Sequence, residues 1–334
     1  MRILVVGAGY WGPNIIRNLV DLPDVEAIGV SDIDPKKVEK MVRRFPRTHA
    51  AAQVPQAFSQ DYQAVIIVTP VNTHAILAKA ALEHGLHVFV EKPLTQNSME
   101  AKNLIETARL VGRQLMVGHV FHYKPEVRRL VEIVKSGELG KICYIDSARV
   151  NLGLFRSDVS AMWDLAPHDL SIFEALLERL PVRVSAIGAT HVVHPVSPQY
   201  TMVHLHLDYG EGCLAHVHVN WFSPVKRRFM MIAGDKKMVT YDDLDASDPI
   251  RVYDRGTYDP EFDTPAYPRL RMGELRIPSI QQEEPLAIEL KEFLSAIREM
   301  RAPLTDGHAG LRVVRILEAA DISLKQGSRF VDLI

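Results

Sequence analysis

The stretch VVGAGYWG, residues 5–12, decides the fold of this chain. Gly7, Gly9 and Gly12 follow a β-branched run in the spacing G-x-G-x-x-G, and a segment of helical character follows at Asn14–Val20. In a strand–turn–helix unit, the first glycine allows the tight turn and the second lets a pyrophosphate approach the backbone. The third lets the helix pack on the strand, with its N-terminus pointing at the phosphates. The stretch therefore predicts a dinucleotide-binding unit.

The next expected strand, Ala27–Val30, indicates which dinucleotide binds. It ends in SDIDP, and Asp32 stands about 20 residues after Gly12, where an acid accepts hydrogen bonds from the ribose hydroxyls. A carboxylate at this position repels a 2′-phosphate, although Lys36 or Lys37 could reach one. We expect NAD as the cofactor rather than NADP.

Strands and helices go on alternating as far as residue 119. AVIIVTP (64–70), HVFVEKP (87–93) and QLMVGH (114–119) are strand-like, with helical segments between them. This alternation predicts a doubly wound parallel sheet in an NAD-binding domain over residues 1–120, with ligands at the carboxyl ends of the strands. The residues that we expect to bind the cofactor are Gly7, Gly9, Tyr10, Trp11, Gly12, Asp32, Thr69, Pro70, Asn72, His74, Glu91, Lys92 and His119.

After residue 120 the pattern changes to long strands joined by turns, with one helix interposed and two amphipathic helices, Pro285–Met300 and Ala309–Gln326, at the end. Direct turns such as YGEG favour antiparallel pairing. We expect a second α/β domain over residues 121–334 with a large, open, mostly antiparallel sheet. The segment Asp242–Pro278 reads as an irregular, exposed excursion.

Composition narrows the function. A chain of 334 residues is long enough for two domains, and 47% hydrophobic and 24% charged residues are typical of a soluble globular protein. A net charge of −2 with no basic run argues against nucleic acid and favours a small-molecule substrate. No stretch resembles a signal peptide or reaches the roughly 18 apolar residues of a membrane helix. We therefore expect a cytoplasmic protein.

The stretch WDLAPHDLSI, residues 163–172, places an acid and an imidazole one helical turn apart. Pro167 is best tolerated in a first helical turn, which makes Asp164 a plausible N-cap with His168 on the same face. A capping acid and an incidental buried histidine are the plain alternative. Oxidation of a secondary alcohol needs a base, a group that orients it and a cation near the alkoxide. His168, Asp164 and Lys92 supply these three functions.

These motifs resemble those of the glucose–fructose oxidoreductase/inositol dehydrogenase (Gfo/Idh/MocA) family over essentially the whole chain. The resemblance rests on the glycine turn, TPVNTH, EKPL, SGELGKI, the Asp-x-x-x-His pair and the C-terminal TDG. It implies a Rossmann domain and an α/β domain whose open sheet mediates oligomerisation, so a homodimer or homotetramer is expected. It also implies that Lys92 and His168 are catalytic with Asp164 beside them, and that the Lys92–Pro93 bond is cis.

Within the family, NLGLFRSD followed by WDLAPHDLSI is similar to the sugar-nucleotide branch, whose members include dehydrogenases that oxidise the 3-hydroxyl of UDP-N-acetylglucosamine or its uronic acid. Such enzymes act in the synthesis of surface polysaccharides. An inositol or free-sugar dehydrogenase is the first alternative, and a non-catalytic NAD-binding regulatory protein is the second. After Gly118 the sequence HVFHYKP departs from the commoner family pattern. The residues that we expect to contact substrate are Lys92, Tyr123, Asn151, Arg156, Trp163, Asp164 and His168.

Four histidines lie in two strand-like segments around YGEG, in the order His204, His206, His216 and His218. A shift of one residue in register would move each pair to the opposite face of the sheet, and no carboxylate or cysteine joins them at a ligand spacing. We expect no metal site there. The two cysteines, residues 143 and 213, are expected in the core, because they lie in apolar strand-like segments.

Overall fold

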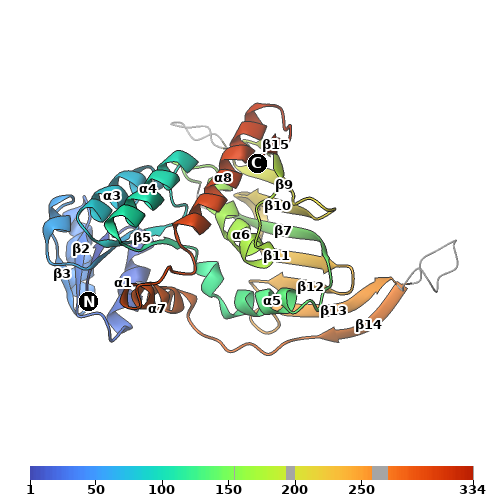
Figure 1. Cartoon of the computed structure of the whole chain (residues 1–334), viewed down its shortest axis with the longest axis horizontal. Helices are drawn as coiled ribbons and strands as arrows, with labels where there is room; N and C mark the ends of the chain where they lie inside the picture. Colours follow the sequence, from blue (N-terminus) through green and yellow to red (C-terminus); the bar gives the residue numbers. More distant parts are fainter. Residues whose placement is uncertain (154, 193–199, 258–269, 334) are drawn as a thin grey trace. The chain divides into compact units, whose positions relative to one another are not determined.

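The computed structural model describes residues 1–153, 155–192, 200–257 and 270–333. They fall into two compact units, Met1–Tyr123 with Glu283–Arg315 and Lys124–Gln282 with Ile316–Ile334 (Figure 1). The first unit thus includes residues 283–315, which the boundaries 1–120 and 121–334 assign to the second domain. Contacts between elements far apart in the sequence decide this assignment, and no local pattern shows them.

The first unit contains a six-stranded parallel sheet in the order β3-β2-β1-β4-β5-β6. This confirms the doubly wound fold expected from the alternating pattern. Its strands are β1 (Arg2–Val6), β2 (Ala27–Ser31), β3 (Thr48–Ala50), β4 (Ala64–Ile67), β5 (His87–Glu91) and β6 (Leu115–Gly118). The connecting helices are α1 (Gly12–Asp21), α2 (Pro35–Arg44), α3 (Val71–Glu83) and α4 (Ser98–Val111), with short 3₁₀ turns η1 (Gln56–Ser59) and η2 (Val120–Tyr123).

Helix α7 (Pro285–Arg298) completes the core of the first unit. It contacts α1 and η2, and the ring of Phe293 lies edge-on to that of Phe89 on β5, with centroids 5.7 Å apart. The beginning of α8 (Gly307–Lys325) approaches β6 closely, because a Cβ at Gly310 would lie 2.7 Å from a methyl of Val117. The C-terminal return therefore packs on the strands whose ends carry the expected site.

The second unit contains a nine-stranded sheet in the order β14-β13-β12-β11-β7-β10-β9-β8-β15. All neighbours pair antiparallel except β7 and β10, which confirms the expected mostly antiparallel sheet. The strands are β7 (Ile142–Leu152), β8 (Arg183–Ala189), β9 (Met202–Asp208), β10 (Leu214–Asn220), β11 (Phe222–Gly234), β12 (Met238–Asp242), β13 (Ile250–Thr257), β14 (Leu270–Arg276) and β15 (Val331–Asp332).

Two helices of the second unit, α5 (Pro125–Lys135) and α6 (Ala161–Leu177), contact one another, and α6 contacts β7, β9 and β10. Alternate residues of β9 are buried, as expected for a strand with one covered face. The expectation that Asp242–Pro278 is irregular was wrong for β13 and β14. β14 is the edge strand of the sheet and β13 is its neighbour, and the polar residues that an edge strand tolerates weaken the strand signal.

Candidate active site

The glycine turn has the geometry that a pyrophosphate requires. Gly7 has a φ of +104°, and a Cβ there would lie 2.7 Å from the carbonyl oxygen of Val68. A Cβ at Gly12 would lie 2.5 Å from the carbonyl oxygen of Gly7, so only glycine lets α1 start this close to β1. At Gly9 a Cβ would meet nothing within 4 Å, so the backbone is open to a bound group. The turn therefore fits a dinucleotide phosphate.

Asp32 follows β2 and faces the glycine turn. One carboxylate oxygen accepts from the backbone N–H of Ala8 at 2.7 Å, and the other accepts from that of Asp34 at 2.8 Å. The ammonium of Lys37 lies 3.9 Å from the same carboxylate. These contacts hold a negative charge where a ribose of NAD would bind.

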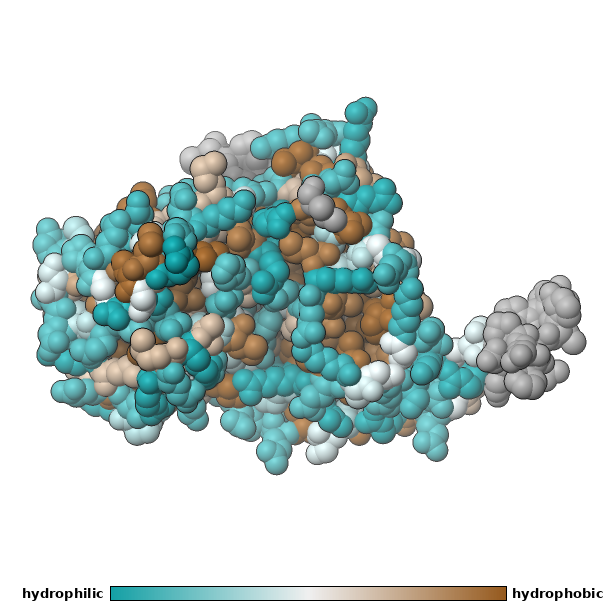
Figure 2. All heavy atoms as spheres, viewed as in Figure 1, coloured by the Kyte–Doolittle hydropathy of each residue, from teal (hydrophilic) through white to brown (hydrophobic). Residues whose placement is uncertain are grey.

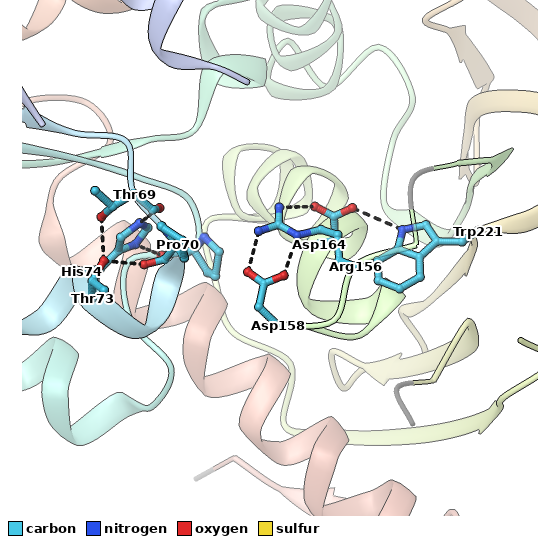
Figure 3. A network of polar contacts seen from close by, with 9 residues as sticks. Thr69, Pro70, Thr73, His74, Arg156, Asp158, Asp164 and Trp221 are labelled. Carbon is cyan, nitrogen blue, oxygen red and sulfur yellow. Dashed lines mark hydrogen bonds and ion pairs between the residues drawn. The ribbon is translucent and has the colours of Figure 1, made fainter. Parts of the chain in front are cut away.

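His74, a residue expected to bind the cofactor, stabilises the loop at the end of β4. Its side chain is buried, and its ring nitrogens lie 2.9 Å from the carbonyl oxygen of Pro93 and 2.8 Å from that of Thr69 (Figure 3). Both nitrogens are thus engaged with the backbone. His74 positions the loops after β4 and β5 instead of offering its ring to a ligand. Asn72 lies in the first turn of α3, beside Pro70 at its N-cap.

At the end of β5, Glu91 links the glycine turn to Lys92. Its carboxylate accepts a hydrogen bond from the indole N–H of Trp11 and another from the backbone N–H of Lys92 at 3.3 Å. Burial raises the pKa of Glu91 to about 7, against the opposing effects of Lys92 and Trp11. Gly118 on β6 makes room for this group, since a Cβ there would lie 3.1 Å from the carboxylate. The Lys92–Pro93 bond is cis, as the family resemblance implied.

His119, at the end of β6, is buried, and neither ring nitrogen has a hydrogen-bond partner among the residues that the structure describes. Burial, together with the neighbouring cationic groups His122, Lys92 and Arg312, lowers its pKa to about 3. A neutral imidazole with two uncommitted nitrogens can still bond a polar ligand. The sequence analysis named neither His122 nor Arg312, which comes from α8 and has no sequence signal linking it to β6.

In the second unit, Asp164 and His168 lie one turn apart on α6, as expected. The helix starts earlier than predicted, however, because Ser160 is the N-cap and its hydroxyl accepts from the N–H of Trp163 at 3.4 Å. Asp164 is therefore in the first turn instead of capping it, and Pro167 lies inside the helix. Packing of α6 on the sheet offsets the one hydrogen bond that Pro167 removes.

The carboxylate of Asp164 is held on both oxygens. The indole nitrogen of Trp221 lies 3.2 Å from one oxygen, and a guanidinium nitrogen of Arg156 lies 3.5 Å from the other (Figure 3). Arg156 also forms a two-pronged pair with Asp158, at 3.0 and 2.7 Å. Trp221 is 57 residues away in sequence and was not anticipated.

A buried ion pair fixes α6 beside His168. The guanidinium of Arg149 on β7 bonds both oxygens of Asp169, at 2.7 and 3.2 Å, and the hydroxyl of Ser147 adds a third bond at 2.8 Å. Both charged side chains are about 95% buried. Charges this far from water persist only when they are paired, so this pair locks the helix to the sheet. Sequence analysis did not identify it.

Two expected substrate contacts are corrected by the structure. Tyr123 is fully buried in the first unit, and its hydroxyl lies 3.0 Å from that of Thr305. Trp163 is buried in the second unit, and its indole donates to Asp321 at 2.8 Å. Both rings belong to the core and are not available to a sugar. Asn151, near the end of β7, remains half-buried.

The four histidines pair across β9 and β10 on the face opposite the buried residues of β9. The Nδ1 atoms of His206 and His216 lie 2.7 Å apart, and the rings of His204 and His218 stack at 4.1 Å. Burial lowers the pKa of His204, His206 and His218. Within the described part of the chain, no group of three or more His, Cys, Asp or Glu residues could hold a metal ion.

Cys213 is buried as expected, whereas Cys143, the second residue of β7, is exposed and does not belong to the core. The face of the molecule drawn in Figure 2 is mostly hydrophilic, with hydrophobic side chains in separate groups. Among the described residues, no helix combines the length and the apolar character that crossing a membrane requires.

Two family models match the chain. Residues 1–119 match the GFO_IDH_MocA model, described as an oxidoreductase family with an NAD-binding Rossmann fold, and residues 127–240 match the GFO/IDH/MocA C-terminal domain. The UDP-N-acetylglucosamine 3-dehydrogenase of Acidithiobacillus ferrooxidans is 27% identical over 94% of each chain. A solved structure of that enzyme superposes with a TM-score of 0.82 at 26% identity, covering 98% of each chain. The inositol 2-dehydrogenase of Burkholderia lata is 28% identical over 61% of each chain.

The glycine turn, Asp32 and the parallel sheet agree with the first family model, and the open sheet carrying α6 agrees with the second. The chain therefore belongs to the Gfo/Idh/MocA family and is an NAD-dependent oxidoreductase of CH–OH groups.

Proposed function

We propose that this enzyme oxidises a secondary hydroxyl of a UDP-linked N-acetylated hexose or its uronic acid, with position C3 as the expected site. Support comes from the UDP-N-acetylglucosamine 3-dehydrogenase, which is similar along nearly the whole chain, whereas similarity to the inositol 2-dehydrogenase covers 61%. The observation that carries the chemistry is the position of Asp164, held on both oxygens one helical turn before His168.

Each proposed catalytic residue has one task. His168 accepts the proton of the substrate hydroxyl, and the carboxylate of Asp164 stabilises the imidazolium that forms. The ammonium of Lys92 stabilises negative charge on the substrate oxygen as the proton leaves. NAD, when bound, supplies the hydride acceptor. Arg156 is the proposed contact for a substrate phosphate or carboxylate, which would compete with Asp158 for its guanidinium.

The experiment measures NADH formation by the purified enzyme with UDP-N-acetylglucosamine, its uronic acid, UDP-glucose, glucose and myo-inositol, with and without 2-oxoglutarate as a recycling acceptor. We expect turnover confined to an N-acetylated UDP-sugar. Turnover only with inositol or glucose would overturn the nucleotide-sugar assignment and support the inositol or free-sugar dehydrogenase.

A second experiment tests the catalytic residues. His168→Asn should abolish turnover and leave the Kd for NAD nearly unchanged, whereas equal loss of NAD binding would assign His168 a structural role. Tight NAD binding by the unaltered enzyme without turnover of any polyol would instead support a regulatory protein. A cytoplasmic location and a dimer or tetramer formed through the nine-stranded sheet stay predictions.

A further inference from the structure

All three tryptophans of the chain donate their indole N–H to a carboxylate. Trp11 donates to Glu91 and Trp163 donates to Asp321, and the third pair joins Trp221 to Asp164. This last carboxylate belongs to the proposed catalytic pair. The question is whether Trp221 only fills space beside Asp164 or also sets its orientation.

Trp221 is held firmly in the second unit. It links β10 to β11 and is 2% exposed. Its backbone N–H donates to the carbonyl of Thr201 at 2.9 Å, and its carbonyl accepts from the N–H of Gly153 at 3.0 Å. The ring of Phe155 packs edge-on against the indole, with centroids 6.2 Å apart. The indole N–H therefore points in a direction that the surrounding fold determines.

The two donors to Asp164 differ in kind. Arg156 is 41% exposed and is shared with Asp158, so water screens its charge and its position can change. The indole of Trp221 is buried, neutral and donor-only, so it fixes one oxygen of Asp164 without cancelling the negative charge. A carboxylate that keeps both its charge and its orientation is the partner that an imidazolium one turn away requires.

We propose that Trp221 is a positioning residue for this enzyme, which acts through Asp164 on the His168 base. The proposal rests on the catalytic roles given above. When the hydroxyl proton moves to His168 and the C–H hydride leaves for NAD, the positive charge on the ring is stabilised by Asp164. The Trp221 hydrogen bond keeps that carboxylate in one orientation throughout.

The first test is kinetic. Trp221→Phe keeps an aromatic ring but removes the N–H. We expect kcat to fall about tenfold, because the loss of one hydrogen bond to a charged group changes a rate by about that factor. The KM for the sugar and the Kd for NAD should change little, and the acid limb of the kcat/KM profile should move to lower pH. In an Asp164→Asn background the same substitution should have little further effect, because the residue it acts through is already neutral. An undiminished tenfold loss in that background would overturn the proposal.

The second test does not depend on turnover. Histidine labelled with ¹³C at Cε1 reports the ring titration of His168 by NMR, with His168→Asn identifying its signal. We expect the titration midpoint to lie lower in Trp221→Phe than in the unaltered enzyme. An unchanged midpoint would overturn the positioning role even in an active enzyme, whereas a shifted midpoint without turnover of any UDP-sugar would contradict only the proposed substrate. If Trp221→Phe misfolds, 3-benzothienylalanine at residue 221 replaces the N–H by sulfur with almost the same shape.

Discussion

The backbone N–H of Ala8, inside the glycine turn, donates to the carboxylate of Asp32 at 2.7 Å. The other oxygen of Asp32 accepts from Asp34, so this side chain ties the end of β2 to the turn after β1. One carboxylate therefore has two functions, which are holding the turn and setting the charge beside the ribose. Substitutions that separate the two functions follow from this geometry.

Asp32→Asn keeps an oxygen that can accept from Ala8 but removes the negative charge that repels a 2′-phosphate. We expect the ratio of kcat/KM for NAD to that for NADP to fall by about tenfold or more, with only a small loss of Tm, because the amide nitrogen cannot accept the hydrogen bond from Asp34. Asp32→Ala should weaken the same preference and lower Tm as well, because Ala8 and Asp34 lose their acceptor. An unaltered cofactor preference in both variants would contradict the assignment of Asp32 to the ribose.

The glycines of the turn should respond differently to alanine. Gly12→Ala places a Cβ 2.5 Å from the Gly7 carbonyl oxygen, so we expect a clear loss of Tm along with NAD binding. The Cβ of Gly9→Ala has no neighbour within 4 Å, so this variant should keep its Tm. The added methyl group, however, lies where the pyrophosphate is expected to approach the backbone. Calorimetric titration with NAD should show affinity reduced at least tenfold in Gly9→Ala, and unchanged affinity would place the phosphates elsewhere.

The sequence correctly predicted the structural features that depend on short spacings between residues along the chain. The G-x-G-x-x-G turn and the strand–helix alternation predicted the parallel sheet, and the four-residue spacing placed Asp164 and His168 on one helix face. These patterns are readable because each follows from the period of a strand or a helix. The N-cap of α6 was misplaced at Asp164 because Pro167 was assigned to a first turn, whereas the structure accepts it further inside the helix.

Contacts between distant segments could not be predicted. Trp221 reaches Asp164 from the link between β10 and β11, Arg149 reaches Asp169 from β7, and residues 283–315 return to the first unit. Each depends on the three-dimensional arrangement of elements, which no periodicity encodes. Tyr123 shows the opposite error, since its place in HVFHYKP after Gly118 suggested a substrate contact but its hydroxyl is bonded in the core.

The buried pair of Arg149 and Asp169 should be among the most sensitive positions of the second unit. Asp169→Asn removes the carboxylate that is bonded to a buried guanidinium, so we expect the free energy of unfolding to fall by about 3–5 kcal/mol. Denaturation in urea, followed by circular dichroism, measures the change. The control is Glu106→Gln, which breaks an exposed pair with Arg109 on α4 and should leave the midpoint unchanged. Equal effects of the two variants would show that the buried pair does not anchor α6.

Glu289 on α7 predicts a pH dependence of stability. Its side chain is fully buried, and neither carboxyl oxygen has a hydrogen-bond partner in the described part of the structure. Burial and the nearby Glu91 raise its pKa well above 4.5, so the folded protein keeps it protonated where the unfolded chain ionises it. The stability that this proton provides is complete at pH values below 4.5 and is lost as pH rises through the raised pKa.

Glu289→Gln cannot ionise and should remove this loss. We expect its Tm to match that of the unaltered protein near pH 5 and to exceed it increasingly towards pH 9. Glu91, whose pKa is raised to about 7, contributes a fall with the same sign in both proteins, so the difference between the two Tm curves reports Glu289 together with its coupling to Glu91. Calorimetric scans at half-unit intervals of pH measure that difference. Parallel curves would mean that the Glu289 carboxyl is hydrated in the folded state and titrates as it does in the unfolded chain.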